Sequence, residues 1–257
     1  MDSGYYAVSA GLAAQAQALE VVAHNLANLG TNGYRGEQTT FRSLLAGHDL
    51  SRAGAAGTNL LNAAVNNFGV LSGSRLDLTS GSIAPTGNPL DVAVAGSGFF
   101  AVQSAQGVGV GVGIGVLYTR DGSFHVTPTG QLVTSQGNAV LGEQGPVTLP
   151  NGAVAISSDG TISVDGTVVD KLRLAEFPPG TNLTALGNAT YAAPAGSAVA
   201  AADSSVRQGM LEGSNVSPTE GVVQLITVQR NAEMLARAFS ALDGQLNQIA
   251  VQDLPKV

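Results

Sequence analysis

The 257-residue chain lacks cysteine and tryptophan altogether, and it has little charge and few aromatic residues. The absence of cysteine excludes disulfide scaffolds, thiolate zinc sites, iron–sulfur clusters and cysteine nucleophiles. Eleven Lys and Arg against 18 Asp and Glu give a formal net charge of −7, which argues against a protein that binds nucleic-acid phosphates. With 44% hydrophobic and only 11% charged residues, the chain has the composition to bury a core.

Targeting signals and membrane spans are also missing from the sequence. The first basic residue is Arg35, whereas a secretory signal opens with a basic segment and an apolar core, so no cleaved signal peptide is expected. The most continuously apolar stretch, residues 108–117, is about half as long as the roughly 20 residues that a transmembrane helix needs. Its glycines also disfavour a helix. We therefore expect no transmembrane segment.

Both ends of the chain are rich in Ala, Leu, Gln and Val, with mostly apolar residues at alternating spacings of three and four. Such a heptad pattern is typical of helices that pack against other helices. The N-terminal seam has one polar interruption, Gln15, and the C-terminal seam has none. The seam positions are Tyr5, Val8, Leu12, Gln15, Leu19, Val22, Leu26 and Leu29 in the first stretch, and Leu225, Val228, Ala232, Leu235, Phe239, Leu242, Leu246 and Ile249 in the last.

A stripe at helical spacing often packs only on the core of its own domain, and that alternative stays open at this point. Each stripe, however, is sustained over roughly three and a half heptads. The two stripes lie at opposite ends of a chain whose middle has the pattern of an independent β-core. We therefore expect helices that complete their burial against partner helices.

The middle of the chain predicts antiparallel β-structure. From Pro89 onward, short β-branched runs alternate with turn dipeptides. Asp121–Gly122, Asp159–Gly160 and Asp165–Gly166 are hairpin signals, because glycine supplies the positive φ of the tight turns. The Ala-rich residues 192–202 are expected to form a loop or linker.

The expected fold class is α+β, with a mainly antiparallel β central domain flanked by long N- and C-terminal coiled-coil-type helices. Residues 47–73 have no sustained period and fit a connector. The expected divisions are an N-terminal helix at 1–35, a connector with short strands at 36–88, a central β-domain at 89–207, and a C-terminal motif and helix at 208–257.

The sequence shows no constellation of residues for catalysis, cofactor binding or metal binding. His24, His48 and His125 are isolated and form no metal-binding pair. The glycine-rich run at 107–115 lacks the following helix of a dinucleotide-binding loop and fits a hairpin tip or an extended strand pair. The DG turns at Asp159 and Asp165 place each carboxylate beside local backbone, so a carbohydrate-active protein is only a remote alternative. We expect no enzyme, no cofactor and no metal.

Two polar motifs bracket the β-rich middle. In the first, Asn25 and Asn28 lie one turn apart near the end of the expected helix and are followed by glycines, which is typical of a helix stop. In the second, residues 209–218, Ser214, Asn215 and Ser217 lie just before the last helical pattern, where such residues act as N-caps, and Pro218 suits the first turn of the helix. The two motifs therefore mark where the chain enters and leaves the β-rich middle.

At these motifs the sequence resembles the flagellar basal-body rod and hook family of bacteria. The N-terminal signature of the family is matched by Asn25, Leu26, Ala27, Asn28, Thr31, Gly33, Tyr34 and Arg35. The C-terminal signature is matched by Gln208, Gly209, Leu211, Glu212, Ser214, Asn215 and Val216, followed by Gln229 and Arg230. Residues 86–94, 96–100 and 118–124 also correspond to family motifs, and residues 140–147 are most similar to proximal rod members.

The resemblance implies a structural subunit that polymerises into the periplasmic driveshaft and transmits motor torque to the hook. Its terminal helices would form an inner α-layer, with the β-domain outside. Its partners would be other rod subunits, of the same and neighbouring kinds, and the flagellar type III export apparatus, which needs no cleaved signal. The two signatures would set the joint between α-layer and β-domain, and the seam residues would carry subunit contacts. A distal rod or hook-type axial protein remains an alternative.

Overall fold

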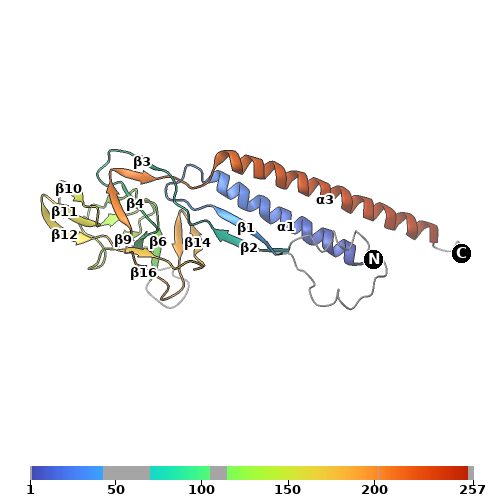
Figure 1. The fold of residues 1–257 in the computed structure, drawn as a ribbon, viewed down its shortest axis with the longest axis horizontal. Helices are drawn as coiled ribbons and strands as arrows, with labels where there is room; N and C mark the ends of the chain where they lie inside the picture. The colour runs from blue at the N-terminus through green and yellow to red at the C-terminus, as the bar shows by residue number, and fades with distance from the viewer. Residues whose placement is uncertain (1, 43–69, 105–114, 202, 254–257) are drawn as a thin grey trace. The chain divides into compact units, whose positions relative to one another are not determined.

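The computed structural model describes residues 2–42, 70–104, 115–201 and 203–253. In this part of the chain the fold is α+β, with two helices and mostly antiparallel strands (Figure 1), which confirms the expected fold class in its coarse form. The described residues form two compact units. Unit 1 contains residues 2–26, 37–42, 70–75 and 218–253. Unit 2 contains residues 27–36, 76–104, 115–201 and 203–217.

Unit 1 is formed by the helices α1 (Asp2–Ala27) and α3 (Pro218–Asp253) with the strands β1 (Glu37–Arg42) and β2 (Val70–Leu76). The two strands pair with each other. Proline occurs in α3 only at the first position, as the sequence suggested, where its missing N–H removes no helical hydrogen bond. The two helices approach each other at Gly221, because a Cβ added there would lie 3.7 Å from Leu26.

The packed side of α1 consists mainly of small residues. Gly11, Ala14, Ala18, Val22 and Asn25 are buried, at spacings of three and four. Of the predicted seam, Val22 is buried and Leu19 and Leu26 are half-buried, but Leu12 is 40% exposed. The buried stripe of α1 therefore lies on a different side of the helix from the predicted leucine-rich seam. The small side chains of the buried stripe allow the neighbouring elements to approach closely.

In α3 the predicted seam coincides with the packed side over the residues whose side chains the structure describes. Leu235 is buried, and the other seam residues there, Leu225, Val228, Ala232 and Phe239, are half-buried. The seam positions Tyr5, Val8, Leu242, Leu246 and Ile249 have side chains outside the described ones. Between α1, β1 and α3 lies a hollow of about 550 Å³, lined by both polar and apolar side chains.

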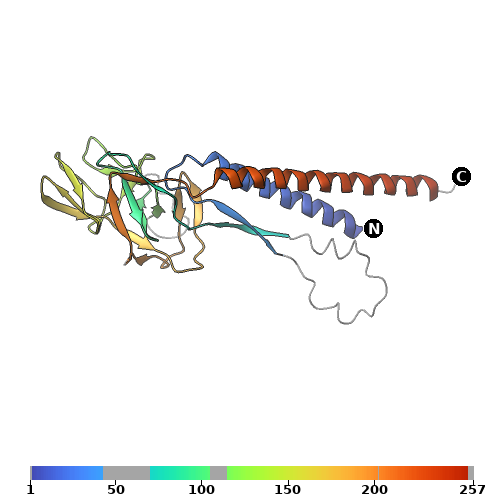
Figure 2. The same ribbon diagram turned by 45° about the horizontal axis from the view of Figure 1, so that its top comes forward.

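Unit 2 is built from strands that belong to several antiparallel sheets (Figure 2). The strands are β3 (Ile83–Pro85), β4 (Val92–Ala95), β5 (Phe99–Gln103), β6 (Val116–Thr119), β7 (His125–Val126), β8 (Leu132–Val133), β9 (Ala139–Val140), β10 (Val154–Ile156), β11 (Thr161–Val164), β12 (Thr167–Lys171), β13 (Leu174–Glu176), β14 (Thr184–Gly187), β15 (Thr190–Ala192), β16 (Val199–Ala200), β17 (Ser205–Gln208) and β18 (Met210–Glu212). The largest sheet has the order β14-β15-β6-β5-β9-β8-β7, with β13 on β5 and β16 on β13. β10, β11 and β12 form a separate three-stranded sheet.

Two of the three predicted DG hairpins are confirmed. Asp159–Gly160 joins β10 to β11, and Asp165–Gly166 joins β11 to β12. The prediction for Asp121–Gly122 is wrong, because β6 before it pairs with β5 and β15. Gly122 serves a close approach instead, since a Cβ there would overlap the carbonyl oxygen of Val92. The expected loop at 192–202 also contains the short strand β16, within its described residues.

The core of unit 2 has two clusters of buried residues. One gathers apolar side chains from most of the strands, from Val92 in β4 to Val206 in β17. The other is centred on Phe99, Tyr118 and Tyr191, whose rings meet each other or Phe177 edge to face. The two clusters bury apolar side chains from most strands of unit 2, and this burial is the main favourable contribution to its folding.

The first and last strands of unit 2 pair with each other. β4 pairs with β17, and β3 pairs with β18 in a register that sets Glu212 opposite Ile83. β3 and β18 lie outside the 89–207 segment expected for the β-domain, yet they belong to unit 2. This pairing brings the segment that leaves unit 2 beside the segment that enters it, and so positions the residues of the site.

Candidate functional site

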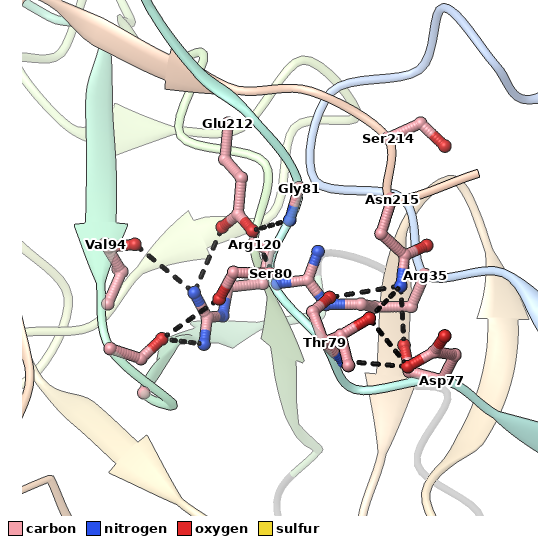
Figure 3. A network of polar contacts seen from close by, with 12 residues as sticks. Arg35, Asp77, Thr79, Ser80, Gly81, Val94, Arg120, Glu212, Ser214 and Asn215 are labelled. Atoms are coloured by element: carbon pink, nitrogen blue, oxygen red, sulfur yellow. Dashed lines mark hydrogen bonds and ion pairs between the residues drawn. The ribbon is translucent and has the colours of Figure 1, made fainter. Parts of the chain in front are cut away.

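The two motifs found in the sequence meet in unit 2, at a polar network that we call the motif junction (Figure 3). It consists of Arg35, Arg120, Glu212 and Asn215. Arg35 lies in the segment after α1, and Arg120 directly follows β6. Glu212 ends β18, and Asn215 lies in the loop that leads to α3.

Glu212 is the centre of the motif junction. Its Oε1 accepts hydrogen bonds from Arg35 Nη2 at 2.7 Å and from the backbone N–H of Gly81 at 2.8 Å. Its Oε2 accepts one from Arg120 Nη1 at 3.0 Å. All three ionic side chains are fully buried. Both carboxylate oxygens are therefore occupied and shielded from solvent.

Arg120 binds three groups besides the carboxylate. Its Nη2 donates to the carbonyl of Gly96 at 2.6 Å and its Nη1 to that of Val94 at 3.3 Å, while the guanidinium lies 4.8 Å from the ring centre of Phe99. Burial lowers the pKa of Arg120 to about 10, and Glu212 opposes this only in part, while Arg35 adds to it. Arg120 thus remains charged at neutral pH.

Two arginines and one glutamate give the motif junction one net positive charge. Arg35 Nε and Nη1 and Arg120 Nε have no hydrogen-bond partner among the described residues. A buried donor without a partner costs about 1–3 kcal/mol, and a buried ion pair is often no more stabilising than an apolar replacement. The motif junction therefore fixes which chain segments meet more than it adds net stability.

Asn215 ties three backbone segments together. Its side-chain oxygen accepts from the N–H of Gly36 at 2.7 Å, and its Nδ2 donates to the carbonyls of Asp77 at 2.9 Å and Thr79 at 3.0 Å. Of the three candidate N-caps of α3, Asn215 does not cap the helix, because its amide is used by these segments. The helix begins at Pro218, which leaves Ser217 at the position before it.

The segment 33–36 is buried although it belongs to no strand. Gly33 N–H donates to the carbonyl of Glu212 at 2.8 Å, and Arg35 N–H donates to the hydroxyl of Tyr191 at 2.8 Å. Gly33 has a φ of +67°, and a Cβ there would overlap the backbone of Arg120 and Asp121. Glycine is therefore required at this position for both reasons.

The remaining predicted site residues lie around the motif junction or make local bonds. Asn25, in unit 1, uses its amide to bind both the N–H and the C=O of Glu37, at 2.9 and 2.7 Å, and so fixes the start of β1. Asn28 Oδ1 accepts from the hydroxyl of Thr31, and Ser214 Oγ accepts from Val216 N–H. Of the others, Tyr34 is buried, Ala27 is exposed, and Leu26, Gly209, Leu211 and Val216 are half-buried.

One residue of the motif junction, Arg120, and two of its partners, Gly81 and Tyr191, were not among the predicted site residues. Arg120 lies 92 positions before Glu212, and Gly81 and Tyr191 contribute an N–H and a hydroxyl from still other segments. The sequence contained two signals for Arg120: it directly follows the strand residues 116–119, where a charge needs a buried partner, and it lies in the family motif at 118–124. The backbone groups of Asp77 and Thr79 carry no such signal.

No catalytic arrangement accompanies this geometry in the part of the chain that the structure describes. There, no group of three or more His, Asp or Glu residues could hold a metal ion. Asp159 accepts from Thr161 within its turn, and Asp165 accepts from Ala153 N–H, just before the paired strand β10, so both carboxylates bond to nearby groups of the three-stranded sheet. None of the described helices is long and apolar enough to cross a membrane.

In the described part of the chain, a buried ionic network joins the entry and exit segments of a β-unit, and two helices flank this unit in sequence. Family descriptions match in chain order: "Flagella basal body rod protein" at 5–35, "Flagellar hook protein FlgE/F/G D1 domain" at 93–168, and "Flagellar basal body rod FlgEFG protein C-terminal" at 207–252. The chain belongs to the flagellar basal-body rod protein family. Arg35 and Glu212 each lie within one of the two rod matches.

Individual relatives cover nearly the whole chain. The flagellar basal-body rod protein FlgF of Salmonella typhimurium is 34% identical over 97% of this chain and 98% of its own length. FlgF of Caulobacter vibrioides is 31% identical over the full length of both chains. The rod protein FlgG of the same organism is 32% identical over 93% of this chain and 94% of its own. The expected family is therefore confirmed.

Proposed function

We propose that the chain is a non-catalytic structural subunit of the proximal rod, which polymerises in the periplasm into the driveshaft between motor and hook. The observation that carries this proposal is the end-to-end similarity to rod proteins, including both chain-end motifs. The similarity of residues 140–147 to proximal members supports the proximal position. The distal rod or a hook-type position remains the alternative, because FlgG proteins are similar over most of the chain as well.

A torque-bearing subunit needs a firm connection where its chain passes from helix to β-unit. The motif junction supplies this connection, because the Arg35–Glu212 pair and Asn215 tie the entering segment 33–36 to the leaving segment 212–215. A load on either segment is then shared by both. In this proposal Asn25, Asn28, Gly33, Tyr34, Leu211, Ser214, Asn215 and Val216 set the joint between the helical layer and the β-domain.

The terminal helices would pair with helices of neighbouring subunits in coiled-coil fashion. Large apolar side chains of α3 support this, because Val222, Val223, Ile226 and Met234 are exposed in the single chain. The partners would be further copies of the chain and neighbouring axial proteins. Delivery through the flagellar type III export apparatus would require no cleaved signal. In the assembled subunit, the chain would be divided as the sequence suggests, into an N-terminal helix at 1–35, a connector at 36–88, a central β-domain at 89–207 and a C-terminal motif and helix at 208–257.

The proposal is tested by deleting the gene in its own organism and restoring it with a tagged copy. Cells without the chain should assemble no hook and should not swim, and the tagged chain should co-purify with basal bodies after detergent and alkaline extraction. A deletion strain that swims normally, or a tagged chain that is absent from basal bodies, would overturn the proposal.

A further inference from the structure

The sequence contains two Asn–Gly dipeptides, Asn32–Gly33 and Asn151–Gly152. Asparagine is a chemically labile residue, and it is most labile before glycine, because no Cβ on the following residue hinders the approach of the backbone nitrogen to the side-chain amide. The reaction needs a backbone that is free to move and a glycine N–H that no other group holds. The two dipeptides differ in both respects.

Asn151–Gly152 lies in a bend of unit 2, directly before β10 (Figure 1). Residues 150–153 are all exposed to solvent. Neither the side chain of Asn151 nor the N–H of Gly152 has a hydrogen-bond partner among the described residues. Both reacting groups are therefore open to water and are not restrained by hydrogen bonds.

Asn32–Gly33 lies beside the motif junction and is held firmly. Gly33 is buried, and its N–H donates to the carbonyl of Glu212 at 2.8 Å. A Cβ at Gly33 would overlap the backbone of Arg120, so this nitrogen is enclosed on several sides. The nitrogen of Gly33 is free to attack Asn32 only after this part of unit 2 has opened locally.

We infer that Asn151 is a site of spontaneous modification in the folded chain, whereas the fold protects Asn32. The nitrogen of Gly152 forms a bond to Cγ of Asn151, the bond from Cγ to Nδ2 breaks, and Nδ2 leaves as ammonia with the proton of the attacking N–H. Water then opens the cyclic imide at either carbonyl and yields aspartate or isoaspartate. The net reaction consumes water and releases ammonia. The inference goes beyond the proposed function and does not depend on it, because the reaction needs only the folded chain and water.

The modification disturbs a connection within the three-stranded sheet. Asp165 Oδ1 accepts from the N–H of Ala153 at 2.9 Å, and the N–H of Asp165 donates to the carbonyl of Ala153 at 3.0 Å. Gly152 packs directly on the same carboxylate, because a Cβ there would overlap it. Isoaspartate lengthens the backbone before Gly152 by a methylene group, and either product adds a negative charge to this bend. The modified chain therefore holds the start of β10 less firmly.

Incubation of the purified full-length chain at mildly alkaline pH, in buffer and in denaturing guanidinium chloride, tests the inference. Trypsin separates the two asparagines into different peptides, and mass spectrometry measures the conversion of each. In the folded chain Asn151 should convert at least about tenfold faster than Asn32, because Asn32 reacts only from locally open states. In the denaturant the two rates should agree within about threefold, since neither dipeptide is then held by the fold. Equal conversion of the two in the folded chain would overturn the inference, as would a stable Asn151 under conditions in which the unfolded chain converts.

Asn151→Ser removes the reactive amide at an exposed position and is the matched control for the effect on β10. Hydrogen exchange of the amides of Ala153 and Asp165 is measured before and after incubation. Both amides should exchange at least about fivefold faster in the modified wild-type chain, because their hydrogen bonds join the bend to the turn after β11. The incubated Asn151→Ser chain should exchange as it did before. Unchanged exchange in the modified wild-type chain would overturn the effect on β10, and an equal change in Asn151→Ser would show that the effect does not arise at Asn151.

Discussion

Arg35 and Glu212 lie 177 positions apart in the chain, and their side chains form an ion pair of 2.7 Å that is fully buried. The pair joins the segment that follows the first helix to the last strand of unit 2. The residues between α1 and β1 therefore belong to the β-unit, although they contain no strand themselves. One residue of each signature motif thus takes part in holding these two segments together.

Replacing Glu212 with Gln should lower the free energy of unfolding by about 3–5 kcal/mol, because it leaves Arg35 and Arg120 buried without a counter-charge. Urea denaturation of the purified chain measures the change. Glu143→Gln, at an exposed position, is the matched control and should stay within about 0.5 kcal/mol of wild type. A similar effect of the two substitutions would contradict the role assigned to Glu212.

Replacing all three ionic residues together should be less harmful than removing the glutamate alone. In the triple variant Arg35→Met, Arg120→Met and Glu212→Leu no uncompensated charge stays in the interior, so most of the lost stability should return. The same urea titrations measure this. If the triple variant is as unstable as Glu212→Gln or more so, the hydrogen bonds of the arginines to backbone matter more than charge balance.

Asn215→Asp should destabilise unit 2 by about 1–3 kcal/mol, because a carboxylate cannot donate to the carbonyls of Asp77 and Thr79. The acceptor for the N–H of Gly36 is kept, so this amide should stay protected in hydrogen exchange when the structure is intact. Ser214→Ala removes only a local bond to Val216 and is the control. Equal stability of the two variants would show that Asn215 does not tie the segments.

Gly33→Ala should destabilise the chain strongly, by about 2 kcal/mol or more, because the added Cβ meets backbone and the φ of +67° is unfavourable for alanine. Gly30→Ala is the matched control, since a Cβ there would meet nothing within 4 Å. Thermal unfolding of both variants measures the difference. A neutral Gly33→Ala would contradict the close approach of this segment to Arg120.

The Tyr118 hydroxyl should make stability fall at alkaline pH. Burial raises its pKa above the ordinary value of 10, with Arg173 opposing only in part, so the folded chain holds this proton more tightly than the unfolded chain. Its contribution is fully present below about pH 10 and is lost as the pH rises further. Tyr118→Phe keeps the ring that packs on Phe177 and should show a shallower loss of stability above about pH 10. Parallel pH curves for the two proteins would contradict the raised pKa.

Local sequence signals predicted the elements well where a short-range rule decides the structure. The terminal heptads predicted both helices, Pro218 occupies the first position of α3, and the turns at Asp159 and Asp165 are hairpins. The rule that an Asp–Gly dipeptide marks a hairpin failed at Asp121–Gly122. There, glycine is needed for the close approach to Val92 and not for a positive φ. A dipeptide alone does not distinguish these two uses of glycine.

The motif junction was only partly predictable for a different reason. Its residues meet because β3 pairs with β18 and β4 with β17, and such registers between distant segments depend on how the whole sheet packs. Arg35 and Glu212 were found as motif residues, but their pairing with each other and with Arg120 follows from this register. Asn215 was assigned to helix capping, because its distant backbone partners leave no trace in the sequence.

The position of the chain in the rod is tested by labelling the tagged chain in isolated basal bodies and locating the label by electron microscopy. We expect label on the rod, concentrated in its cell-proximal part, in particles that also carry the distal rod and hook. Label confined to the hook or the distal rod would contradict the proximal assignment, and intact basal bodies without any label would contradict a structural role in the rod.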